Sequence, residues 1–145
     1  VVGIGLGAQV LSLAADGGIL EAPLAFDIGM AHRVQDGALG GFLPERYPVV
    51  TYGRDRSRPP AYADILAVDE AGEPALFQIG PNAFGFAGHP GLRPAMIEDL
   101  IMEFEEAPAG CAELLPELAR IAPRIEDALV PIMTGLVAVT GWMRI

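Results

Sequence analysis

The sequence predicts an α+β fold in which an antiparallel sheet from residues 1–90 is packed by helices from the C-terminal part. Residues 1–90 are rich in Gly and Pro and contain short apolar runs of strand length, whereas residues 91–145 place apolar side chains at helical spacing. The 145 residues are 52% hydrophobic and 19% charged, which suffices for one core, so residues 1–145 are expected to form a single domain, whole or cut from a longer chain.

The opening stretch VVGIGLGAQV supports an alternative fold class, an α/β fold that starts with a Rossmann-like βαβ unit. Gly3, Gly5 and Ala8 match the G-x-G-x-x-[G/A] pattern that lets backbone approach a pyrophosphate. Asp27 follows about 20 residues later, where such a unit holds a ribose hydroxyl of NAD or FAD. This reading requires residues 7–16 to be a helix. The rival reading makes them part of a hairpin, because no second crossover helix follows.

Three strands are expected next, at residues 47–53, 65–68 and 75–79, where β-branched and aromatic residues gather. The segment DEAGEP between the last two is rich in turn formers and predicts a hairpin. Pro74 has no N–H to donate and should start its strand or lie on an edge. The three strands are expected to form one antiparallel meander.

Helical patterns begin at Pro94. One apolar stripe runs through Ile97, Leu100, Ile101 and Phe104, and Pro108 is expected to end that element. A second stripe between residues 115 and 132 is interrupted by three prolines. Because proline breaks the helical ladder, we expect two or three short helices or one kinked helix there. Residues 135–145 are expected to form a strand or an apolar tail.

Four of the nine basic residues lie close together at Arg46, Arg54, Arg56 and Arg58. The last three alternate, so an extended loop would project them to one side. Arginine grips carboxylates and phosphates in a bidentate way, which predicts a site for an anion or an acidic protein surface. The alternative is that these arginines pair with the protein's own acids.

Catalytic candidates are few. His89 lies in a loop rich in Gly and Pro and is the weak candidate for proton transfer. The chain has no GxSxG sequence, its histidines and its single Cys111 show no metal-ligand spacing, and no metal is expected. Cys111 is interpreted as a small buried residue.

The net charge of −10 argues against binding nucleic acid or an anionic membrane. The high fraction of hydrophobic residues and the low fraction of charged residues suggest a homo-oligomer or larger assembly. We therefore expect a non-enzymatic assembly or binding domain that self-associates through apolar surface. Its arginine-rich loop is expected to contact an acidic partner or an anion, and no cofactor is expected. The alternatives are a dinucleotide-binding oxidoreductase fragment and a small enzyme acting on an anionic substrate. A cytoplasmic location is expected. The alternative is that the first residues are the end of a truncated signal peptide.

Overall fold

The chain folds around a six-stranded mixed sheet with the strand order β1-β8-β7-β6-β3-β4. The structure is a computed structural model and describes residues 1–104 and 106–143. The strands of this sheet are β1 (Val2–Ile4), β3 (Ala25–Arg33), β4 (Arg46–Gly53), β6 (Asp64–Val68), β7 (Pro74–Ile79) and β8 (Ala83–Phe86). β1 pairs with β8 in parallel, and every other neighbouring pair is antiparallel. The architecture is thus a mixed α/β sheet with helices, and the expected purely antiparallel sheet is corrected at its β1 edge.

A second, two-stranded ribbon extends the β3–β4 hairpin. Strand β2 (Gly18–Leu20) precedes β3 and pairs antiparallel with β5 (Arg56–Arg58), which follows β4. The corner between the sheet and this ribbon is held by Asp55, whose φ of 62° turns the chain. The amide of Asp55 donates to the Ala22 carbonyl at 3.1 Å, and its carboxylate accepts from the Ala22 amide at 2.9 Å. These two bonds fix where the ribbon leaves the sheet.

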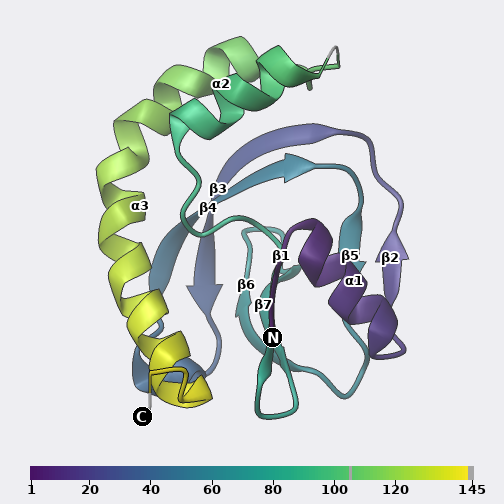
Figure 1. Cartoon of the computed structure of the whole chain (residues 1–145), viewed down its shortest axis with the longest axis vertical. Coiled ribbons are helices and arrows are strands. Elements are labelled where there is room, and N and C mark those ends of the chain that lie inside the picture. The colour runs from purple at the N-terminus through teal and green to yellow at the C-terminus, as the bar shows by residue number, and fades with distance from the viewer. Residues whose placement is uncertain (105, 144–145) are drawn as a thin grey trace.

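Helices lie on both sides of the strands (Figure 1). Helix α1 (Leu6–Ala14) packs against β1, β8 and the β2–β5 ribbon. The long helix α3 (Cys111–Thr140) lies on the other side, against β3, β4 and the short 3-10 helix η1 (Ala38–Gly41). Helix α2 (Pro94–Glu103) crosses the upper end of α3 in this view. The strands therefore lie between helices α1 and α3.

The opening stretch does form a strand and a helix, because residues 6–14 are helical. The expected dinucleotide unit is nevertheless wrong. Such a unit places its second strand parallel to the first, but β2 pairs antiparallel with β5 and the parallel neighbour of β1 is β8. The Rossmann-like alternative is therefore contradicted by strand pairing, although its helix exists.

The hairpin prediction for the middle of the chain is confirmed by the pairing of β6 with β7, and Pro74 is the first residue of its strand. The wider meander is wrong, because β4 lies at the sheet edge beside β3 and does not contact β6 as a neighbour. The loop rich in Gly and Pro that was expected around His89 begins later than its composition suggests, because Phe84 and Phe86 are buried residues of strand β8. Their rings belong to the larger hydrophobic cluster.

The C-terminal stripe forms one curved 30-residue helix rather than several short ones (Figure 1). Pro116, Pro123 and Pro131 lie inside it and account for the curvature. The strand expected from residue 135 is wrong, since the helix continues to Thr140; residues 144–145 of that prediction lie outside the described residues. Helix α2 was expected to continue to Pro108, but it ends at Glu103.

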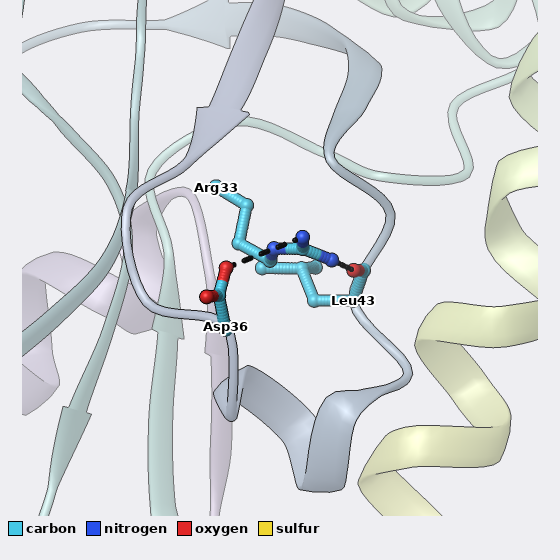
Figure 2. Close-up of polar contacts among 3 residues, drawn as sticks. All are labelled: Arg33, Asp36 and Leu43. Carbon is cyan, nitrogen blue, oxygen red and sulfur yellow. Dashed lines mark hydrogen bonds and ion pairs between the residues drawn. The ribbon is translucent and has the colours of Figure 1, made fainter.

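The turn after β3 is tied down by Arg33. Its guanidinium donates to the Leu43 carbonyl at 2.9 Å and to the Asp36 carboxylate at 3.5 Å (Figure 2). One side chain thus links both ends of the segment that carries η1, on which α3 packs.

Within residues 1–104 and 106–143, no helix combines the length and apolar character that crossing a lipid bilayer requires.

We predict that Gly135→Ala destabilises the protein, although alanine is the better helix former. A Cβ at Gly135 would lie 2.7 Å from both Cβ and O of Leu39, so α3 must move away from η1. We expect a loss of about 1–3 kcal/mol in the free energy of unfolding, measured by urea denaturation. The control Ala138→Gly, at an exposed site of the same helix, measures the intrinsic propensity term of about 1 kcal/mol. A more stable Gly135→Ala variant would contradict the close packing.

Candidate functional site

The main cavity of the described structure has a volume of about 1260 Å³. Its walls come from the start of α1, the end of β4, the β2–β5 ribbon, the segment 87–92 and α2. These segments are far apart in sequence and are brought together by the fold. The cavity is therefore a product of the whole fold and the natural place to look for a ligand.

A sharp strand-to-helix elbow forms one end of this cavity. Strand β1 ends at Ile4, α1 begins at Leu6, and Gly5 between them has φ 57° and ψ −111°. The elbow is tight, since a Cβ on Gly3 would lie 2.4 Å from the Gly7 carbonyl oxygen. Only glycine at position 3 allows the first turn of α1 to lie this close to β1. Gly5 and Leu6 both line the cavity.

The elbow has the spacing and geometry that expose a catalytic nucleophile in other enzymes. In the G-x-S-x-G elbow, the central residue sits on a strained strand-to-helix turn between two small residues. Here the glycines at 3 and 7 are in place, and Gly5 occupies the nucleophile position. Sequence reasoning missed this site because it searched for a serine at the centre; the flanking glycine pair was the available signal.

The start of α1, beside the cavity, has backbone amides without helical partners. The first hydrogen bond within α1 joins the amide of Gln9 to the Gly5 carbonyl at 3.2 Å. The amides of the preceding turn, including that of Leu6, therefore have no partner inside the helix. An elbow normally uses the amide after its central residue to stabilise negative charge on a carbonyl oxygen. Leu6 follows Gly5 and is the residue at the corresponding position here.

His89 lies on the cavity wall and is held by its neighbours. Its amide donates to the Val50 carbonyl at 2.7 Å, and its Nδ1 accepts from the Gly91 amide at 3.0 Å. Burial lowers the pKa of the imidazole below its usual range. A neutral ring whose Nδ1 accepts must carry its proton on Nε2. His89 therefore offers the cavity a hydrogen-bond donor rather than a base.

The four arginines do not form one cluster. Arg54, Arg56 and Arg58 line the cavity, whereas Arg46 lies at the far end of β4, opposite His32 on β3. Arg54 forms an ion pair with Glu106. In the described part of the chain, Arg56 and Arg58 have no carboxylate oxygen within 4.0 Å of their nitrogens. The alternative of pairing with the protein's own acids thus applies to Arg54.

The four residues proposed for a dinucleotide are divided between wall and core. Gly5 and Asp27 line the cavity, while Gly3 and Ala8 lie behind it in the contact between β1 and α1. Cys111 is buried in a separate hydrophobic cluster with α2 and α3, where burial raises the pKa of its thiol. Among the described residues, no group of three or more His, Cys, Asp or Glu side chains is arranged to hold a metal ion.

Comparison with solved structures identifies the fold. A glutamine amidotransferase from Thermotoga maritima superposes with a TM-score of 0.74 and 20% identity, over 96% of this chain and 61% of that one. A glutamine amido transferase from Methylobacillus flagellatus gives 0.77 and 15%, over 95% and 62%. This chain has a glutamine amidotransferase-like fold. It spans about three fifths of the length of these two proteins. No protein-family model and no curated protein sequence matches it.

This fold overturns the function expected from composition. The function expected from composition, an assembly domain, is corrected, because the chain has a glutamine amidotransferase-like fold with a cavity. The expected homo-oligomer stays a prediction. The dinucleotide-binding oxidoreductase alternative is also wrong, because the fold is amidotransferase-like and β2 pairs antiparallel with β5 instead of parallel with β1. The alternative of a small enzyme on an anionic substrate is likewise replaced. The roles predicted for individual residues stay predictions.

We predict that Gly3→Ala destabilises the protein by about 1–3 kcal/mol, because its methyl group would overlap the backbone of α1. Gly7→Ala is the matched control, since a Cβ there meets no atom within 4 Å and alanine favours the helix by about 1 kcal/mol. Urea denaturation of both variants measures the difference. Equal stability of the two variants would contradict the tight elbow.

A second prediction concerns the pH dependence of stability. The pKa of His89 is lowered in the folded protein, so the unfolded chain binds its proton more readily. The contribution of His89 is therefore fully present above about pH 6.5 and is lost as the pH falls. The free energy of unfolding of the wild type, minus that of His89→Gln, should decrease from pH 7 to pH 5. A difference that stays constant or rises on acidification would contradict the burial of a neutral ring.

Proposed function

We propose that this chain is an amidotransferase-like domain whose elbow cavity binds a small carboxamide compound without forming a covalent bond to residue 5. The observation that carries this proposal is Gly5 at the centre of an otherwise intact elbow. An acyl-enzyme route needs a thiol or hydroxyl group at that point. Glycine keeps the backbone geometry and removes the reacting atom.

The groups that remain at the elbow suit the oxygen of an amide. Leu6 and His89 both line the cavity, and each has a donor, the Leu6 amide and the His89 Nε2–H, that matches the acceptor oxygen of a carboxamide. Donors aimed at a carbonyl oxygen bind it whether or not a reaction follows. The proteins of this fold from Thermotoga maritima and Methylobacillus flagellatus are described as glutamine amidotransferases, which supports L-glutamine as the first ligand to test.

Ser57 and Cys111 do not replace the missing nucleophile. Ser57 lines the cavity, but its Oγ is buried and has no hydrogen-bond partner among the described residues, so no base stands beside it. Cys111 is buried in the cluster shared by α2 and α3 and does not line the cavity. Neither Ser57 nor Cys111 therefore combines a place on the cavity wall with an adjacent base that would activate a nucleophile.

We predict saturable binding of L-glutamine without turnover. Isothermal titration should give a binding isotherm, while an ammonia-release assay stays at the level of buffer. His89→Gln should weaken binding about tenfold, the change expected for one lost hydrogen bond to the ligand. His32→Gln, on β3 and outside the cavity wall, is the control. Absence of binding, or ammonia release by the wild type, would overturn the proposal.

A thiol placed at the elbow tests the geometry directly. A Cβ at Gly5 meets no atom within 4 Å, so Gly5→Cys fits at the cost of its positive φ, about 1–3 kcal/mol. Its thiolate would lie at the N-terminus of α1, which lowers a thiol pKa. In a Cys111→Ala background, we expect iodoacetamide to alkylate Gly5→Cys at least about tenfold faster than Gly72→Cys, with L-glutamine slowing only the former. Gly72 is the matched control because it combines φ 80° with open space. Equal rates for the two variants, or equal slowing by L-glutamine, would contradict the elbow site.

A further inference from the structure

We propose that Arg56 and Arg58 bind the carboxylate of the ligand whose amide end lies at the elbow. This inference rests on the proposed function and names the second recognition point of the same cavity. Both residues line the cavity, on the β2–β5 ribbon rather than on the elbow. The ligand it specifies is a zwitterionic amino acid with a neutral carboxamide side chain.

The ribbon projects the two arginines to one side. Arg56 and Arg58 are two residues apart on β5, opposite Leu20 and Gly18 of β2, so their side chains leave the same face. The backbone beneath them is well fixed. Asp55 is bound twice to Ala22, and a Cβ at Gly17 would lie 2.5 Å from the Arg58 carbonyl oxygen. The pair therefore stands on a rigid support.

Charge pairing separates these two arginines from Arg54. Arg54 is engaged by Glu106, and its carbonyl accepts from the side-chain amide of Gln9 at 2.9 Å. Arg56 donates only to the Asp55 carbonyl, at 3.3 Å, and is half-buried. Within the described residues, neither Arg56 nor Arg58 has an acidic partner. Two guanidinium groups with free donors on one cavity wall suit a carboxylate, which accepts bidentate bonds.

The same cavity wall carries four carboxylates, Asp27, Asp55, Asp69 and Glu73. Three of them already accept backbone amides, Asp27 from Ile28, Asp55 from Ala22, and Asp69 from Ala71 and Glu73. These negative charges disfavour a ligand with two carboxylates, and they suit the ammonium group of an amino acid. A wall of mixed sign thus selects a zwitterion over a dianion.

The experiment compares L-glutamine with L-glutaminamide, in which the carboxylate is replaced by a second carboxamide. The wild type should bind L-glutamine at least about tenfold tighter. Arg56→Gln and Arg58→Gln should each weaken L-glutamine binding about fivefold or more, and the double variant should lose the preference between the two compounds. Arg124→Gln, on α3 and outside the cavity wall, is the matched control, and thermal melting checks that each variant is folded.

The outcomes separate this inference from the proposed function. If the double arginine variant is folded and still prefers L-glutamine as the wild type does, while His89→Gln weakens binding, the carboxylate site is wrong and the elbow site stands. If the wild type binds neither compound, both proposals fail. If the wild type binds the two compounds equally, the ligand carboxylate makes no contact and the inference is overturned.

Discussion

The close approach of two backbone segments, at Gly3 and Gly7, is the constraint on which the site depends. It brings the first turn of α1 against β1 and forces the sharp turn at Gly5. This contact places Leu6 at the cavity and sets the direction in which α1 meets the β2–β5 ribbon. A larger residue at position 3 would change the end of the cavity before it changed any side chain that faces a ligand.

The cavity joins two kinds of recognition that the chain supplies from separate places. The elbow offers neutral donors fixed by backbone geometry, and the ribbon offers charged donors fixed by the corner at Asp55. Gly5 keeps the backbone turn of the elbow and carries no side chain that could form a bond to a ligand.

Local features of this fold could be predicted from the sequence, whereas its long-range pairing could not. The turn formers before Pro74 identified the β6–β7 hairpin, and the apolar stripe from Ile97 identified α2. The parallel pairing of Val2 with Phe84 joins segments too distant for any local pattern to reveal. The alternation of Arg54, Arg56 and Arg58 predicted one shared side, and the structure places only Arg56 and Arg58 on strand β5. Nothing local could show that β4 carries Arg46 to its opposite end. The elbow was overlooked because its diagnostic residue is a glycine.

The curved helix α3 has a consequence for how the molecule unfolds. Its first half packs Leu118, Ile121 and Ile125 into the cluster beneath α2, and its second half packs Ile132 and Leu136 into the cluster around η1. One helix thus belongs to both clusters, while each internal proline leaves the carbonyl four residues before it without a helical partner. Amide protons near those carbonyls should exchange with solvent early, while the two clusters lose protection together as one cooperative unit.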